Sequence, residues 1–235
     1  MIEFFTNLSP VLPDAPLLRW LSPLCWGVVL AFLWLRVGGR FGNRTRLWVG
    51  GVVVAWALIP SMWSPAYWLG LAFQAPSWMT VLLCGAYLLH SMGRASTQQL
   101  PPVGNQASLY LSTQVACLVF LGIALGWVLL LDTLVLLPVY VYRWGFGTAL
   151  LACAVVIALV LCIAQPARDQ RANAAVYPGY VLAVALLLFV LTRLPTGNVL
   201  DALIDPWLWL WLQVSLVRRV IRRRRHRQNA TATRG

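Results

Sequence analysis

The chain contains no lysine, because all 18 of its basic side chains are arginines, set against six acidic residues and two histidines. Retinal and several other cofactors attach to proteins through a lysine Schiff base. The absence of lysine therefore excludes retinal chemistry, which would otherwise be a candidate for a bundle of about seven membrane helices.

Charged residues of either sign are scarce. They make up 10% of the chain, whereas 60% of its residues are hydrophobic. Soluble domains carry about a quarter charged residues. This composition excludes an ordinary soluble domain and predicts a protein of the membrane.

Patterns that bind metals or cofactors are also missing. The two histidines, His90 and His226, lie far apart in the sequence, and the five cysteines are isolated within apolar stretches. Neither set has the spacing of zinc or haem ligands. The sequence contains no phosphate-binding glycine loop and no serine-nucleophile motif. We therefore predict no catalytic residue, no metal and no cofactor.

Long apolar stretches are what the chain has in abundance. A bilayer core about 30 Å thick needs about 20 apolar residues of helix. The stretches that indicate spans are 15–35, 47–62, 65–92 (interrupted by Pro76), 109–131, 146–164 and 174–192. They predict an all-α, polytopic membrane helical bundle.

The arginines predict how this bundle is threaded. Basic residues in short loops stay on the cytoplasmic side. Fifteen of the 18 arginines fall on the cytoplasmic side if the chain crosses seven times, with its N-terminus outside and its C-terminus cytoplasmic. Only Arg19, Arg143 and Arg193 are left for the outer side. The fifteen are Arg36, Arg40, Arg44, Arg46, Arg94, Arg168, Arg171, Arg218, Arg219, Arg222, Arg223, Arg224, Arg225, Arg227 and Arg234.

The seventh span is the shortest. Residues 207–217 are apolar, but as a helix they reach only about 16 Å. A continuous helix from Val199, with Arg218 and Arg219 snorkelling to the headgroups, gives about 20 residues. It would include Asp201 and Asp205 at its outer end. The alternative is six spans with an interfacial final helix.

The organisation expected from these features is a single transmembrane helical domain over residues 1–217, followed by a cytoplasmic arginine-rich tail over 218–235. The N-terminus has no basic segment before its first apolar run, so we expect no cleavable signal peptide.

Small residues recur four positions apart in several spans. Such pairs let helix backbones approach closely. The pairs are Gly27/Ala31, Gly122/Gly126, Ala154/Ala158 and Gly179/Ala183. We interpret them as contacts within the chain, and association with another helix is the alternative.

Tryptophans concentrate in the predicted outer half, which holds nine of the thirteen. In the outer connection, Ser64-Pro65 is typical of a helix start and Ala75-Pro76 of a break. We expect a short helix there that lies in, or dips into, the outer interface. This layer is either an enlarged aromatic belt or a docking surface for lipid, lipid-linked substrate or another subunit.

Ionisable groups near the outer interface are the candidate functional groups. Asp132 could pair with Arg143, and Asp205 with Arg193; simple exposure and a role in substrate binding are the alternatives. The candidate cluster of the outer face comprises Trp68, Gln74, Asp132, Tyr142, Arg143, Asp201, Asp205 and Trp207.

The basic tail indicates contact with anionic lipid headgroups, to which each arginine near the surface contributes about 1 kcal/mol. The arginines expected to make this contact are Arg218, Arg219, Arg222, Arg223, Arg224 and Arg225. Binding of nucleic acid is not expected.

Three function classes remain. We favour a non-enzymatic subunit or assembly partner of a membrane complex, with a tryptophan-rich outer face that contacts lipid or partner helices. A small transporter or channel component, and a membrane enzyme acting on a lipid-linked substrate at the outer interface, are the alternatives. Exclusive use of arginine is typical of GC-rich genomes and suggests a bacterial inner membrane.

Overall fold

The computed structural model describes residues 12–38, 42–96, 113–164 and 178–232, without the side chains of residues 43, 93–96, 113–114 and 222–232. Over these ranges the chain is helical and has no strand. The helices are α2 (Ala15–Val37), α3 (Asn43–Ala57), α4 (Pro65–Phe73), α5 (Trp78–Ser96), α6 (Thr113–Thr133), α7 (Val141–Trp144), α8 (Thr148–Ile163), α9 (Pro178–Thr192), α10 (Val199–Leu203) and α11 (Pro206–Ala232). The predicted all-α class is confirmed.

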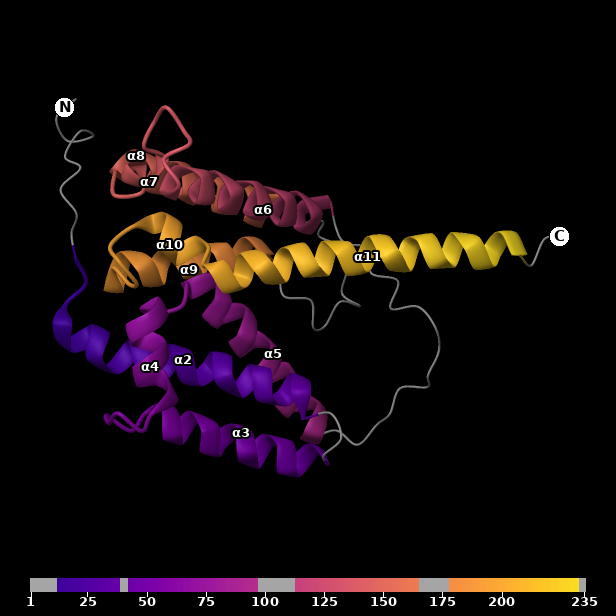
Figure 1. Ribbon diagram of the computed structural model, residues 1–235, viewed down its shortest axis with the longest axis horizontal. Coiled ribbons are helices and arrows are strands. Elements are labelled where there is room, and N and C mark those ends of the chain that lie inside the picture. The colour runs from indigo at the N-terminus through magenta and orange to yellow at the C-terminus, as the bar shows by residue number, and fades with distance from the viewer. Residues whose placement is uncertain (1–11, 39–41, 97–112, 165–177, 233–235) are drawn as a thin grey trace.

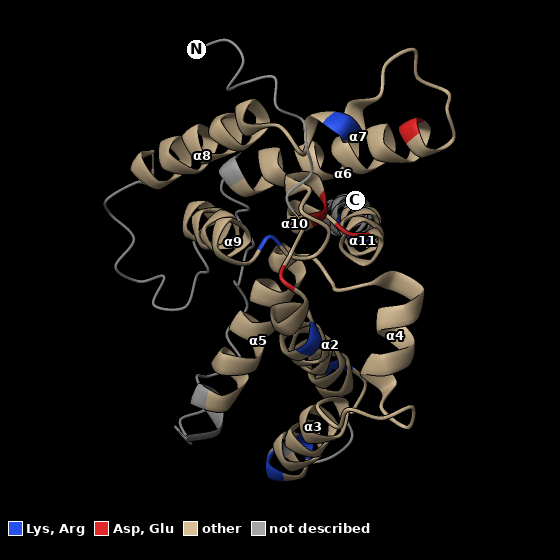
Figure 2. Cartoon of the chain, turned by 90° about the vertical axis from the view of Figure 1, so that its left-hand side faces the viewer, with Lys and Arg blue, Asp and Glu red and all other residues tan. Residues whose placement is uncertain are grey.

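The long helices run in alternating directions along one axis of the molecule (Figure 1). The short helices α4, α7 and α10 gather at one end, which we call the short-helix end. The far part of α11 extends from the opposite end, which we call the arginine end. Seen from the short-helix end (Figure 2), the acidic residues lie beside α6, α10, α11 and the start of α2.

Packing joins the helices in two groups. Helix α2 packs against α3, α4 and α5, and α9 packs against α5, α8 and α10, so these helices form one continuous group. Helix α6 packs against α7 and α11. One core surrounds Phe189 and Leu186 of α9, and a second surrounds Trp26 and Phe32 of α2. Helix α11 lies between α6 and the α2 group.

Two of the small-residue pairs contain a glycine at which two helices of this chain pack closely, as the sequence predicted. A Cβ atom on Gly126 would lie 2.1 Å from Cδ1 of Trp209, and one on Gly179 would lie 2.8 Å from the backbone nitrogen of Cys162. Since Cβ atoms do not approach other atoms so closely, only glycine allows α11 to pack on α6 and α9 to pack on α8 at these distances. The interpretation of these pairs as intrachain contacts is confirmed for both.

Two helices of the described ranges are long and apolar enough to cross a membrane, α2 and residues Val115–Thr133 of α6. Three other apolar helices, Trp78–Met92, Thr148–Ile163 and Pro178–Thr192, are shorter. At 1.5 Å per residue these shorter helices extend about 22–24 Å.

The prediction of one continuous helix from Val199 is wrong. Helix α10 ends at Leu203, Ile204 is extended with φ −142° and ψ 134°, and α11 begins at Pro206. Proline has no N–H group and fits the first turn of a new helix. Asp205 caps that helix, because its side chain accepts a hydrogen bond from the N–H of Leu208 at 2.7 Å.

The expected short helix in the connection over 62–78 is confirmed at both ends. Helix α4 starts at Pro65 after Ser64 and ends at Phe73, before Ala75-Pro76. Helix α5 then starts at Trp78, where the hydroxyl of Ser77 accepts a hydrogen bond from the N–H of Thr80 at 3.1 Å.

Candidate functional site

Asp132 caps helix α7 at the short-helix end. Its carboxylate lies at the end of α6, is 8% exposed, and accepts hydrogen bonds from the N–H groups of Val141 (3.2 Å) and Tyr142 (2.7 Å). Backbone N–H groups at a helix N-terminus are a natural partner for a carboxylate. Asp132 makes no ion pair with Arg143, which is exposed. Of the alternatives that the sequence left open for Asp132, neither the pair with Arg143 nor simple exposure is found.

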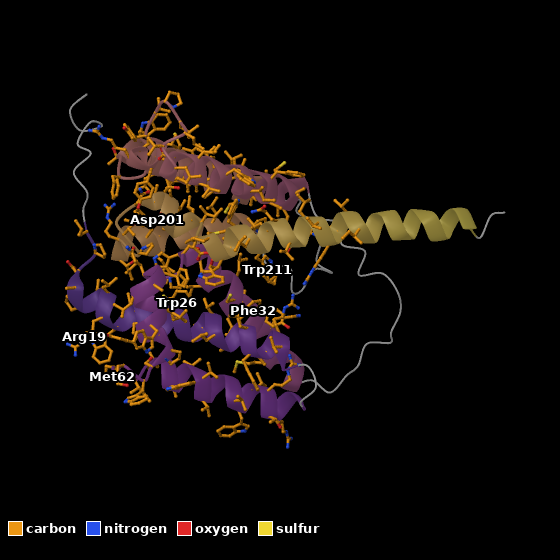
Figure 3. All side chains as sticks on the ribbon, in the orientation of Figure 1. Arg19, Trp26, Phe32, Met62, Asp201 and Trp211 are labelled. Carbon is orange, nitrogen blue, oxygen red and sulfur yellow. The ribbon has the colours of Figure 1, made fainter. Side chains whose placement is uncertain are left out.

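Tyr142 connects α7 to the segment between α9 and α10. Its hydroxyl donates a hydrogen bond to the carboxylate of Asp201 at 2.6 Å, and the hydroxyl of Thr196 donates to the same oxygen. Figure 3 shows Asp201 at this end of the molecule, on α10. Asn198 is fully buried; its amide nitrogen donates to the carbonyl of Tyr142 at 2.8 Å, and its amide oxygen accepts from the N–H of Leu200 at 2.9 Å.

Gly145 allows the side chain of Asn198 to pack directly against the α7 segment. The N–H of Val199 donates to the Gly145 carbonyl at 3.0 Å, and a Cβ atom on Gly145 would lie 1.7 Å from the side-chain oxygen of Asn198. No other residue fits there while Asn198 keeps its position. We call Asp132, Tyr142, Gly145, Asn198 and Asp201 the α7–α10 network.

The α7–α10 network changes the acidity of Tyr142. Burial raises the pKa of the Tyr142 phenol to about 12, and the hydrogen bond and negative charge of Asp201 add to the rise. Both effects oppose formation of a second negative charge. Tyr142 is therefore a hydrogen-bond donor at neutral pH.

Asp205 joins α5 and α11 in a second polar site. One carboxylate oxygen accepts from the N–H of Ser77 at 2.9 Å, and the other from the N–H of Leu208 at 2.7 Å. Ser77 is fully buried. Asp205 does not pair with Arg193, which the sequence allowed as an alternative; the guanidinium of Arg193 lies 5.5 Å from the ring centre of Phe189.

A cavity of about 270 Å³ lies beside Asp205. Its lining residues come from α2, from the end of α4 and the connection to α5, and from the start of α11. They are Trp26, Ala72, Phe73, Gln74, Ala75, Pro76, Asp205, Pro206 and Trp207. The rings of Phe73 and Trp207 meet edge to face at 5.2 Å, and the ring of Trp26 lies 6.5 Å from that of Phe73. The indole N–H of Trp26 donates to the Gln74 carbonyl at 2.7 Å.

Exposed tryptophans frame the turn between α3 and α4. The indole N–H of Trp56 donates to the carbonyl of Trp63 at 3.0 Å, and that of Trp68 donates to the carbonyl of Met62 at 2.8 Å. Buried Ser64 donates to the carbonyl of Ala57 at 2.9 Å. Trp63 is nevertheless 79% exposed and Met62 65% exposed, and Figure 3 shows Met62 at the edge of the molecule. We call Trp56, Met62, Trp63 and Trp68 the tryptophan turn.

The predicted outer-face residues therefore occupy three places. Asp132, Tyr142 and Asp201 belong to the α7–α10 network, Gln74, Asp205 and Trp207 line the cavity, and Trp68 belongs to the tryptophan turn. Arg143 is exposed and joins none of the three.

Sequence reasoning missed several residues of these sites. Asn198 and Ser77 were detectable in principle, because each is a helix-capping residue type placed directly before a helix. Gly145, Trp26 and Phe73 carry no local signal, since their partners lie far away in the sequence.

Trp207, Trp209 and Trp211 contact protein on both faces of α11. Trp209 packs on Trp127 of α6 at 5.2 Å between ring centres. Trp211 lies 5.6 Å from Phe32 of α2, and Figure 3 shows these two rings between the helices.

At the arginine end, Arg36 lies among aromatic rings. Its guanidinium is 5.4–5.9 Å from the ring centres of Phe32, Tyr87 and Trp211. Of the predicted lipid-contacting arginines, Arg218 is exposed and Arg219 half-buried on α11. The side chains of Arg222, Arg223, Arg224 and Arg225 lie outside the described residues.

The described residues include no group of three or more histidine, cysteine, aspartate or glutamate side chains able to hold a metal ion. No family model, curated protein or solved structure matches the chain.

Proposed function

We propose that the chain is a multi-pass protein of the bacterial inner membrane and serves as a non-enzymatic subunit or assembly partner of a membrane complex. It crosses seven times, through α2, α3, α5, α6, α8, α9 and α11. Its short-helix end faces outward, and its arginine end lies in the cytoplasm, with α11 carrying the basic tail to anionic headgroups.

The alternating helix directions support this threading. Arg36 at the end of α2 and Arg44 at the start of α3 lie at the arginine end, and α11 carries Arg218 toward it. Asp132, Asp201 and Asp205 lie at the short-helix end. Basic residues in short loops favour the cytoplasmic side, whereas acidic residues contribute little. Arg19, Arg143 and Arg193 are the described arginines at the short-helix end.

The main support for the proposed role in a complex is the exposed and rigid surface of the tryptophan turn. Trp63 is 79% exposed, yet the turn is held by hydrogen bonds from Trp56, Trp68 and Ser64. An apolar surface that is both exposed and fixed loses little conformational freedom on binding, which favours a contact surface.

The carboxylates support a non-enzymatic role. An enzyme or transporter would use carboxylates that face a shared cleft. Here Asp132 and Asp205 each accept two backbone hydrogen bonds, and Asp201 accepts from Tyr142 and Thr196. All three are engaged in joining helices.

Site-specific photo-crosslinking tests this function. A photoreactive amino acid at position 63, in the full chain expressed in its membrane, should give a discrete crosslinked protein, and the same complex should copurify in mild detergent. The same group at Leu121, which is 54% exposed on the flank of α6, is the matched control and should give lipid adducts. Lipid adducts alone from position 63, with a monomer in mild detergent, would contradict the proposed role.

A further inference from the structure

The cavity beside Asp205 combines aromatic rings with a carboxylate. Trp26, Phe73 and Trp207 supply three rings, and Asp205 and Gln74 supply the polar side chains. The rings come from three different helices, α2, α4 and α11. The fold therefore assembles an aromatic enclosure from segments that are distant in sequence.

The charge lining this cavity is opposite to that of the protein. The chain has a net charge of +12, yet among the described residues that line the cavity Asp205 is the one ionisable residue, and no arginine is among them. The N-terminus of α11 carries a partial positive charge of about half a unit. That partial charge offsets only part of the carboxylate charge, so the cavity remains negative.

The backbone of the cavity wall adopts an unusual conformation. Gln74 has φ 59° and ψ −144°, a region that side chains other than glycine rarely adopt. The hydrogen bond from the Trp26 indole to the Gln74 carbonyl, 2.7 Å long, holds it there. Backbone strain of this kind concentrates at binding sites, where the surrounding structure enforces it.

We propose that this cavity binds a small ammonium group. The faces of tryptophan and phenylalanine rings attract cations, and quaternary ammonium groups are bound in this way by aromatic enclosures. The Asp205 carboxylate adds a fixed negative charge, and a cavity of about 270 Å³ suits one such group. The ammonium belongs either to an amine-bearing lipid headgroup or to a free amine. The site is independent of the proposed role in a complex.

Binding of choline by the full-length protein tests the site. The protein is purified in an uncharged maltoside detergent, and choline chloride is titrated calorimetrically against a sodium chloride blank. We expect saturable binding by the wild type, weakened about tenfold in Asp205→Asn and in Trp207→Leu. Asp14→Asn and Trp20→Leu, which change an exposed carboxylate and an exposed ring outside the cavity, should bind choline as the wild type does.

The two cavity variants guard against a loss of folding. Asparagine is a good helix cap, so Asp205→Asn should keep the bond from Leu208 and the helical circular dichroism of α11, while its NH2 group gives up the bond from Ser77. Trp207→Leu leaves the carboxylate and both of its bonds unchanged. Failure of the wild type to bind choline would overturn the proposal. Wild-type affinity in both folded cavity variants would also overturn it.

Bilayers of different composition separate the two sources of the ammonium group. In nanodiscs of phosphatidylglycerol, which has no amine, choline should still bind. If phosphatidylcholine nanodiscs abolish this binding, the headgroup occupies the cavity and the ligand is a lipid. If choline binds equally in both, the ligand is a free amine.

Discussion

At the scale of single residues, the α7–α10 network depends on the absence of a side chain at Gly145. Its backbone carbonyl accepts from Val199, and the space beside its Cα is filled by the side chain of Asn198. The network therefore tolerates no side chain at this position.

Gly145→Ala should destabilise the protein by about 3 kcal/mol or more, because the added carbon overlaps a fully buried amide that has no room to move. Thermal unfolding in detergent would measure the loss. Gly51→Ala is the control, since a Cβ atom there meets nothing within 4 Å, and alanine favours a helix over glycine. Equal melting temperatures for the two variants would contradict the geometry.

The phenol of Tyr142 should ionise at a higher pH than an ordinary tyrosine. Its pKa rises to about 12 from an ordinary value of 10, so between these pH values the folded state holds a proton that the unfolded state has released. The stability due to Tyr142 is complete below pH 10 and is lost as the pH rises through 12. Absorbance of tyrosinate should show a late transition that Tyr142→Phe removes; identical alkaline titrations would contradict the assignment.

The sequence could suggest these residues only in part. Asp132, Tyr142 and Asp201 are recognisable as polar groups in an apolar chain. Their partners are not, because Tyr142 and Asp201 are 59 residues apart and no local pattern encodes such a contact. The pairs with arginine, one of the alternatives that the sequence left open, do not form, because backbone N–H groups bond to both carboxylates.

At the scale of elements, α6 and α11 are joined by the indole ring of Trp209, which packs against Gly126. Gly126→Ala should separate them, because a Cβ atom would lie 2.1 Å from Trp209, whose indole also donates to the carbonyl of Ile123 at 3.2 Å. Trp209→Ala in addition should restore part of the loss by vacating that space. Thermal unfolding of the two single variants and the double variant measures the coupling, and strictly additive losses would contradict direct contact.

Element boundaries were predictable where capping residues set them. Ser64-Pro65 and Ala75-Pro76 correctly mark α4. Asp205-Pro206 carries the same kind of signal for α11, but the length needed to cross a bilayer favoured a continuous helix from Val199. In the structure a new helix begins after Asp205, because its side chain accepts hydrogen bonds from Leu208 and from Ser77 at the same time. A residue inside a continuous helix could not do this.

At the scale of the whole molecule, the proposed threading places the two ends of the chain on opposite sides of the membrane. In a protein whose five cysteines are replaced by alanine, Asp14→Cys should react with an impermeant maleimide added to intact cells. Ala230→Cys should react only after the membrane is opened. Equal reactivity of both positions from outside would exclude an odd number of crossings.

The helical fold class follows from the long apolar stretches, since a stretch of about 20 apolar residues indicates a helix, which bonds its own backbone within the segment. The arrangement of the helices does not follow in the same way. Contacts such as Trp211 with Phe32 and Trp207 with Phe73 depend on which helices become neighbours, and the charge pattern fixes only their directions.

The position of α11 bears on the order in which the protein is made. It lies between α6 and the α2 group, and it leaves the ribosome after every helix that it contacts. Until α11 is made, Gly126 lacks the contact with Trp209, Phe32 lacks that with Trp211, and Phe73 lacks that with Trp207. A chain arrested before Pro206 should thus have its two groups of helices joined by the α7–α10 network, without the contacts of α11 along their length.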